Sequence, residues 1–218
     1  MCLSHGIGPD NIDIVINELD ALANIDFKTR EVKENFRQLS MVRIGTSGAL
    51  QPELIVGTPV VAEKAIGFDG VLNYYAGRNE IADLEFEKAF TEHTGWNPLW
   101  AKPYVVDAHS ELVDQIAKDD MVRGNTISAV GFYGPQGREL RLPLANPDLN
   151  SRIESFRFGD RKVTNYEMES APLQGLSRLM GHRAMTVCSI IANRMRHDAT
   201  PNYKTAIRDL IATVLERI

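Results

Sequence analysis

The sequence predicts a single α/β domain over residues 1–218, with a central mixed, twisted sheet that carries helices on both faces. Segments typical of strands alternate with segments of helical periodicity along the chain. The run 183–193 is largely apolar, as expected of a central strand that is covered on both faces. A chain of 218 residues, of which 44% are apolar, is long enough to bury one large core.

The expected elements are recognised by apolar periodicity and by turn residues between them. In chain order they are a helix at 10–23, a surface loop at 26–40, a strand with a glycine-rich turn at 41–50, one or two strands within 53–66, a helix at 83–94, a strand at 103–108, a helix at 110–120, a strand at 124–134, a helix at 150–156, a strand at 162–169, a helix at 170–180, a strand at 183–193 and a closing helix from 200–201.

Capping residues mark several of these ends. Asp10 or Asn11 can cap the first helix, and Gly95 can end the helix at 83–94. Ser110 and Ser170 stand where two later helices begin, so we expect both to act as N-caps.

Composition excludes several classes of function. The net charge of −5 and the lack of a basic run make duplex nucleic acid a poor partner. Cys2 and Cys188 are too few for a disulfide framework, and no cysteine or histidine spacing indicates a metal site. We expect a reduced, cytoplasmic setting, no signal peptide and no membrane span. The histidines are expected to be surface or packing residues; they are His5, His93, His109, His182 and His197.

The segment "RIGTSG" at 43–48 has the chemistry of an anion site. Arg43 carries a planar fork of donors, and Thr46 adds a hydroxyl. Gly45 lets backbone N–H groups approach an anion closely. The alternative from the residues alone is a strand-terminal turn with an exposed arginine.

The segment "GFYGPQGRELR" at 131–141 could bind a flat ring. Phe132 and Tyr133 can stack on it, Gln136 offers a donor and an acceptor, and Arg138 offers donors only. A base with two carbonyls and one ring N–H, such as uracil or thymine, matches this set. The alternative is a surface hairpin with a solvated arginine.

The segment "NYEMES" at 165–170 places Glu167, Met168 and Glu169 between an expected strand and an expected helix. A buried carboxylate is costly unless a partner satisfies it. The segment is therefore either a surface turn or part of a pocket whose ligand supplies the partners.

Read together, these segments resemble the type-I nucleoside phosphorylase family, and within it the members that cleave uridine. The segments that carry the resemblance, in the family's order, are "SHGIGPDNIDIVINELDAL", "RIGTSGALQP", "GFYGPQGREL", "NYEMES" and "MTVCSIIANR". The resemblance implies that uridine and phosphate give uracil and ribose 1-phosphate. Phosphate is then a co-substrate, and no cofactor is needed.

The resemblance also implies a role for each site residue. Phosphate is contacted by Arg43, Gly45 and Thr46. The base is bound by Phe132, Gln136, Arg138 and Arg194, and the ribose by Glu167, Met168 and Glu169. Arg43, Thr46 and Arg138 are the implied catalytic residues. Purine-acting relatives carry an aspartate in the strand that corresponds to 186–192, and its absence here favours a pyrimidine.

The chain departs from the family at its start. The family begins with a further strand and a Gly-Asp-Pro-x-x-Arg loop, which have no match here, so we expect the chain to start after that segment. The resemblance implies a homo-oligomer built from dimers. Two alternatives stay open: a truncated, non-catalytic homologue that binds nucleosides or partners, and a nucleosidase or purine-acting relative. Arg43 argues against a nucleosidase, because nucleosidases bind no phosphate.

Overall fold

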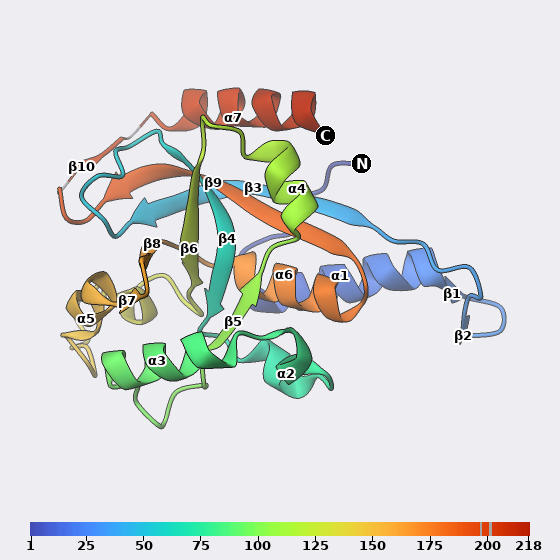
Figure 1. Cartoon of the computed structure of the whole chain (residues 1–218), viewed down its shortest axis with the longest axis horizontal. Coiled ribbons are helices and arrows are strands. Elements are labelled where there is room, and N and C mark those ends of the chain that lie inside the picture. Colours follow the sequence, from blue (N-terminus) through green and yellow to red (C-terminus); the bar gives the residue numbers. More distant parts are fainter. Residues whose placement is uncertain (197, 201) are drawn as a thin grey trace.

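The computed structural model describes residues 1–196, 198–200 and 202–218. Over these residues one large sheet is surrounded by helices, and one small hairpin projects from the body (Figure 1). None of the helices in this described part is long and apolar enough to cross a membrane.

The large sheet is mixed, as predicted, and it closes on itself. Its strands, in spatial order, are β10 (Asp198–Ala199), β9 (Arg183–Asn193), β3 (Ser40–Ala49), β8 (Arg161–Glu167), β6 (Val122–Ser128), β4 (Pro59–Gly67) and β5 (Tyr104–Asp107), with β7 (Arg157–Phe158) paired to β8. Strand β9 also pairs antiparallel with β4, so β9, β3, β8, β6 and β4 form a ring. Because strand twist accumulates across a sheet, a strongly curled sheet can close in this way.

Helices pack around this ring. They are α1 (Pro9–Asn24), α2 (Arg78–Ile81), α3 (Leu84–Thr94), α4 (Ser110–Ile116), α5 (Leu149–Ser155), α6 (Ser170–Leu179) and α7 (Lys204–Arg217), with short 3-10 turns η1 (Val71–Tyr74) and η2 (Gly134–Gln136). Helices α4 and α7 share one apolar cluster, α1 and α6 a second, and α3 and α5 a third. Each cluster also contains side chains of the sheet, so the helices cover it on different sides (Figure 1).

Helix α6 begins where polar groups of the sheet satisfy its first N–H groups. Ser170 does not act as its N-cap: the helix begins at Ser170, Glu169 occupies the cap position, and the Ser170 hydroxyl has no described partner. The carboxylate of Glu167 accepts the N–H of Ser170, and the hydroxyl of Ser128 accepts the N–H of Ala171. A carboxylate here also complements the positive end of the helix dipole.

Other helix ends also differ from expectation. Helix α1 begins at Pro9 with Gly8 in the cap position at φ 95°, a backbone conformation that glycine adopts without strain. Neither Asp10 nor Asn11 caps it. Helix α4 has His109 in the cap position and ends at Ile116, well before residue 120. Helix α7 begins at Lys204; residue 201 of the expected start, like His197, lies outside the described residues.

Two strands end at positions that the sequence did not predict. Residues 43–48 do not form a glycine-rich turn, because β3 continues to Ala49 and pairs with β9 over its whole length. Strand β6 ends at Ser128, and the segment that follows forms the turn η2 rather than a hairpin.

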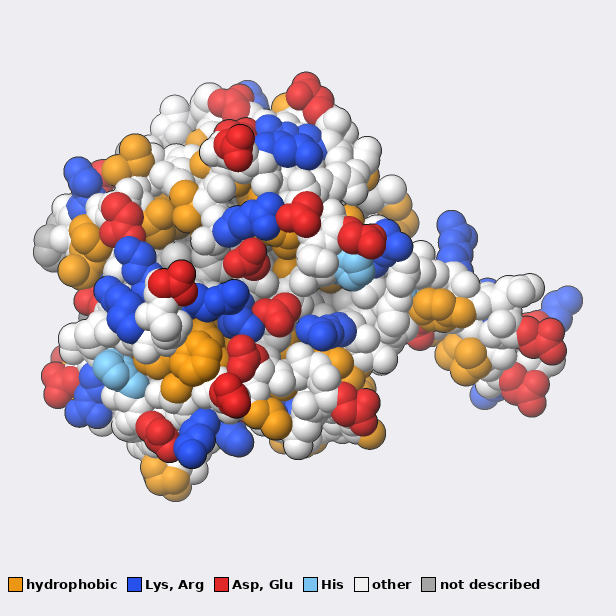
Figure 2. Space-filling view, viewed as in Figure 1, with side chains coloured by type: hydrophobic (Ala, Val, Ile, Leu, Met, Phe, Trp, Pro, Cys, Tyr) orange, Lys and Arg blue, Asp and Glu red, His pale blue; other side chains and the backbone are white. Residues whose placement is uncertain are grey.

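The expected surface loop at 26–40 contains a short hairpin. Its strands are β1 (Ile25–Asp26) and β2 (Glu31–Val32). The hairpin projects from the body, and Figure 2 shows apolar side chains on it. Phe27 and Val32 are 64% and 75% exposed. Nothing in the structure shows what covers them.

Candidate active site

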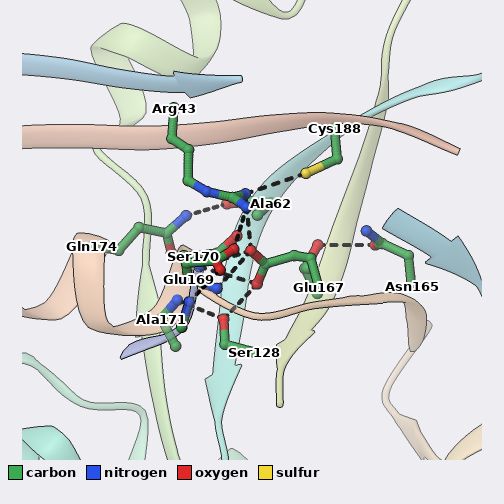
Figure 3. A network of polar contacts seen from close by, with 12 residues as sticks. Arg43, Ala62, Ser128, Asn165, Glu167, Glu169, Ser170, Ala171, Gln174 and Cys188 are labelled. Atoms are coloured by element: carbon green, nitrogen blue, oxygen red, sulfur yellow. Dashed lines mark hydrogen bonds and ion pairs between the residues drawn. The ribbon is translucent and has the colours of Figure 1, made fainter. Parts of the chain in front are cut away.

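Arg43 of β3 lies between two carboxylates (Figure 3). Its Nη1 is 2.9 Å from Oε2 of Glu167, and its Nη2 donates to Oε2 of Glu169. The side chains of Arg43, Glu167 and Glu169 are only 9%, 1% and 6% exposed. The segments 43–48 and 165–170 are therefore not surface turns, and the two anionic groups find a partner in one shared cation.

Glu167 is fully engaged by the protein. Besides Arg43 it accepts hydrogen bonds from the Ser128 hydroxyl at 2.5 Å and from the N–H groups of Glu169 and Ser170 at 2.8 and 3.0 Å. Its position at the last residue of β8 directs it beneath the start of α6. All four of these partners of Glu167 belong to the protein itself.

Glu169 joins the N-terminal segment to the cluster. Its Oε1 accepts the N–H of Gly8 at 2.7 Å. Burial raises the pKa of Glu169, opposed by the positive charge of Arg43 and reinforced by the negative charge of Glu167. Met168, between the two glutamates, is half-buried and thus available as an apolar surface beside the cluster.

The groups around Arg43 favour its charged form. Burial disfavours the charged guanidinium, but Glu167, Cys188 and Glu169 outweigh this and raise the pKa of Arg43. Its Nη1 also lies 3.4 Å from Sγ of Cys188, to which it donates. Burial raises the pKa of the Cys188 thiol to about 12, so near neutral pH this side chain is an uncharged acceptor.

Gly45 and Thr46 relate to Arg43 in different ways. A Cβ atom on Gly45 would lie 2.9 Å from Nη1 of Arg43, so the glycine gives the guanidinium room to lie along the strand. Thr46 is half-buried, and among the described residues its hydroxyl makes no side-chain hydrogen bond.

A second cluster forms around the loop at 131–141. The guanidinium of Arg138 lies 3.9 Å from the centre of the Phe132 ring and donates to Oε1 of Gln136 at 2.5 Å. Gln136 is 3% exposed, and its backbone carbonyl accepts from Nη1 of Arg194. The structure thus brings together all four residues assigned to the base.

The two arginines make this second cluster positively charged and rich in hydrogen-bond donors. Burial, followed by the charge of Arg194, lowers the pKa of Arg138 to about 10; burial also lowers the pKa of Arg194. Arg194 lies 5.2 Å from the ring centre of Tyr166, and its Nη2 is buried without a partner in the described chain. Such donors suit carbonyl oxygens or a group that gains negative charge.

Strand β8 connects the two clusters. Tyr166 contacts Arg194, and the next residue, Glu167, holds Arg43. A surface depression of about 780 Å³ lies elsewhere and is lined by residues such as Lys64, Asp107 and His109. Lys64 there is already paired with Asp83 and Asp107 at 2.8 and 2.7 Å. Within the described residues, no group of three or more His, Cys, Asp or Glu side chains is placed to hold a metal ion.

A sequence model described as the phosphorylase superfamily matches residues 1–217. The chain belongs to the phosphorylase superfamily. This superfamily member is 30% identical over 204 residues to uridine phosphorylase from Thermococcus kodakarensis. The aligned region covers 89% of the chain and 58% of that relative. It is 28% identical over 205 residues to uridine phosphorylase from Escherichia coli, of which it spans 66%. The chain thus spans roughly three-fifths to two-thirds of these relatives.

The fold of this superfamily member also matches a solved structure. A nucleoside phosphorylase from Trypanosoma brucei that shows uridine phosphorylase activity superposes with a TM-score of 0.86 at 26% identity. The match covers 98% of the chain and 78% of the trypanosomal protein. The predicted fold class and the resemblance to uridine phosphorylases are confirmed.

Several residues of the site were not foreseen. Ser128, Cys188 and the N–H of Gly8 complete the Arg43 cluster, and Asn150 supports the other by donating to the carbonyl of Gln136 at 3.1 Å. Gly8 and Cys188 lie in two of the segments that carry the resemblance, but no role was expected of them, and Ser128 and Asn150 lie in none of those segments. Ser128 could have been found only by knowing that β6 and β8 are parallel neighbours, which places it opposite Glu167.

Proposed function

We propose that this chain carries a nucleoside phosphorolysis site that converts uridine and phosphate into uracil and ribose 1-phosphate. The observation that carries the proposal is the arrangement of the two clusters along β8. A carboxylate and a fixed cation form one cluster. The Gln136–Arg138 pair is linked through Arg194 to Tyr166, the residue before Glu167 on β8. The similarity to uridine phosphorylases supports the choice of uridine.

The reaction separates charge, since the leaving base becomes negative as the sugar becomes positive. The Arg138 cluster faces the base, and the Arg43 cluster faces the sugar and phosphate. The bond between the sugar carbon and the base nitrogen breaks, and its electron pair passes to uracil. A phosphate oxygen then forms the new bond to the same sugar carbon, and solvent or phosphate supplies the proton that uracil takes up. Arg138 and Gln136 stabilise the developing negative charge on the uracil oxygens, an effect typically worth about 2.7–4 kcal/mol for one preorganised donor.

The sugar and phosphate are held by the other cluster. Glu169 can accept the two hydroxyl donors of the ribose diol, with Met168 as the apolar surface beneath the ring. Arg43 and the Thr46 hydroxyl bind phosphate, the nucleophile. Because phosphate is already an anion, no general base is required. A homo-oligomer and a cytoplasmic location belong to the same proposal, supported by the family resemblance.

The test is uracil release from uridine by the purified 218-residue chain, with and without phosphate. We expect release that depends on phosphate. Release without phosphate would indicate a nucleosidase, and no release from folded protein would reject the proposed reaction. Inosine as a second substrate tests for purine cleavage, which we do not expect.

Substitution of Arg138 tests the role of the second cluster. We expect Arg138→Ala to lower kcat/KM for uridine by about a hundredfold or more, because it removes a donor that stabilises the leaving base. Arg141→Ala is the matched control, since Arg141 is an exposed arginine of the same loop. Equal kinetics for the Arg138 and Arg141 variants would contradict the assigned role.

A further inference from the structure

Ser128 connects the end of β6 to the Arg43 cluster. It is fully buried, accepts the N–H of Ala171 at 2.8 Å and donates to Oε1 of Glu167 at 2.5 Å (Figure 3). A backbone N–H can only donate, and a carboxylate accepts. The serine hydroxyl therefore has its proton directed at Glu167 and a lone pair directed at Ala171. No other orientation satisfies both partners.

Glu167, held in this position by Ser128, in turn fixes the position of the Arg43 side chain. With Oε1 held by Ser128 and Ser170, its Oε2 accepts from Glu169 and lies 2.9 Å from Nη1 of Arg43. The Nε atom of Arg43 has no partner in the described chain. The direction of the guanidinium fork is thus fixed by its terminal nitrogens alone. Glu167 is the more buried of the two carboxylates that hold them.

We propose that Ser128 is a positioning residue for the anion site at Arg43, acting through Glu167. This inference rests on the proposed function, since it takes phosphate to be the anion. Ser128 does not touch the substrates. Its hydroxyl keeps Glu167 beneath the start of α6, so that the Arg43 fork is held ready for phosphate before phosphate arrives.

The chain offers a matched comparison two residues earlier on the same strand. Thr126 and Asn165 are cross-strand partners, as are Ser128 and Glu167. The buried Thr126 hydroxyl donates to Oδ1 of Asn165 at 2.9 Å, so it makes the same kind of bond between the same two strands. Neither Thr126 nor Asn165 makes a hydrogen bond or ion pair with Arg43 in the described chain.

The experiment compares Ser128→Ala, Ser128→Thr and Thr126→Val with the unaltered chain. Phosphate binding is measured by calorimetry, phosphate and uridine KM by kinetics, and stability by urea unfolding. We expect Ser128→Ala to weaken phosphate binding about tenfold, as for a lost bond to a charged group. We expect Ser128→Thr to restore it, because the hydroxyl returns. Thr126→Val should lose comparable stability yet bind phosphate within about twofold of the unaltered chain.

Several outcomes would overturn the inference. They are unchanged phosphate binding in Ser128→Ala, an equal loss in Thr126→Val, and no recovery in Ser128→Thr. Absence of phosphate binding by the unaltered chain would also overturn it. If Ser128→Ala does not fold, Ser128→Cys replaces it, since a thiol fills similar space but is a weak donor. Phosphate binding without uracil release would reject the proposed reaction while leaving the comparison of Ser128 with Thr126 readable.

Discussion

At the scale of single residues, the site is governed by the limited number of donors on one arginine. Arg43 uses its terminal nitrogens for Glu167, Glu169 and Cys188. Two carboxylates thus share one guanidinium in a buried setting. A phosphate that binds here must compete with carboxylates for the same guanidinium. Glu169, the carboxylate that we propose binds the sugar, is the one whose loss would ease that competition.

Glu169→Gln separates the sugar role of this residue from its effect on phosphate. The amide keeps one acceptor oxygen but loses the charge that holds Arg43. We expect uridine to bind about tenfold more weakly, free uracil to bind unchanged, and phosphate to bind no more weakly than before. Calorimetry with the three ligands checks this. Equal losses for uridine and uracil would show that Glu169 does not contact the ribose.

At the scale of elements, strand β3 shows why the chemical role of a side chain is easier to predict from sequence than the conformation of the backbone that carries it. The glycines of 43–48 indicated a turn because glycine is common in turns. In the structure Gly45 lies inside a ladder with β9, where its missing side chain makes room for Arg43. This packing role depends on the position of the Arg43 side chain in the folded protein. The local sequence contains no information about that position.

Gly45→Ala tests that role. The new Cβ would stand 2.9 Å from Nη1 of Arg43, so the guanidinium must shift while the strand keeps its pairing. We expect phosphate binding to weaken about tenfold or more, with a smaller effect on the urea midpoint. Gly48→Ala on the same strand is the control, since its nearest neighbour would be 3.9 Å away. Equal phosphate binding by both variants would contradict the packing role.

In the rest of the site, too, some residues could be predicted from the sequence and others could not. Arginines, glutamates and glutamine at the ends of expected strands pointed to the two clusters, because such groups rarely occur there without a partner. Ser128 and Cys188 were not foreseen, since an isolated serine or cysteine carries no pattern. Their importance comes from strand neighbours that are far apart in sequence.

At the scale of the whole molecule, the spatial order of the strands is what assembles the site. Strands β3, β8 and β6 are adjacent in the ring, although β3 is separated from β6 and β8 by more than seventy residues of sequence. This adjacency places Arg43, Ser128 and Glu167 within hydrogen-bonding reach of one another as a chain of contacts. The periodicity of single strands predicts a mixed sheet but contains no information about which strands become neighbours.

Burial of charged groups around this ring also makes stability depend on pH, and Asp69 gives a test. Asp69 follows β4 and accepts hydrogen bonds from the N–H of Val71 at 2.8 Å and the hydroxyl of Tyr104 at 2.9 Å. Burial raises the pKa of Asp69 from 3.8 to about 6, although both hydrogen bonds oppose the change. Between these two values the folded chain holds a proton that the unfolded chain has released.

The free energy of unfolding should therefore fall as pH rises from about 4 to about 6, by at most about 3 kcal/mol from this group. Asp69→Asn cannot ionise, so it should lose this part of the pH dependence and become more stable relative to the unaltered chain as pH rises. Urea unfolding across this range checks the slope, with Asp160→Asn at an exposed turn as the control. Parallel curves for the unaltered chain and Asp69→Asn would show that Asp69 ionises as freely when folded as when unfolded.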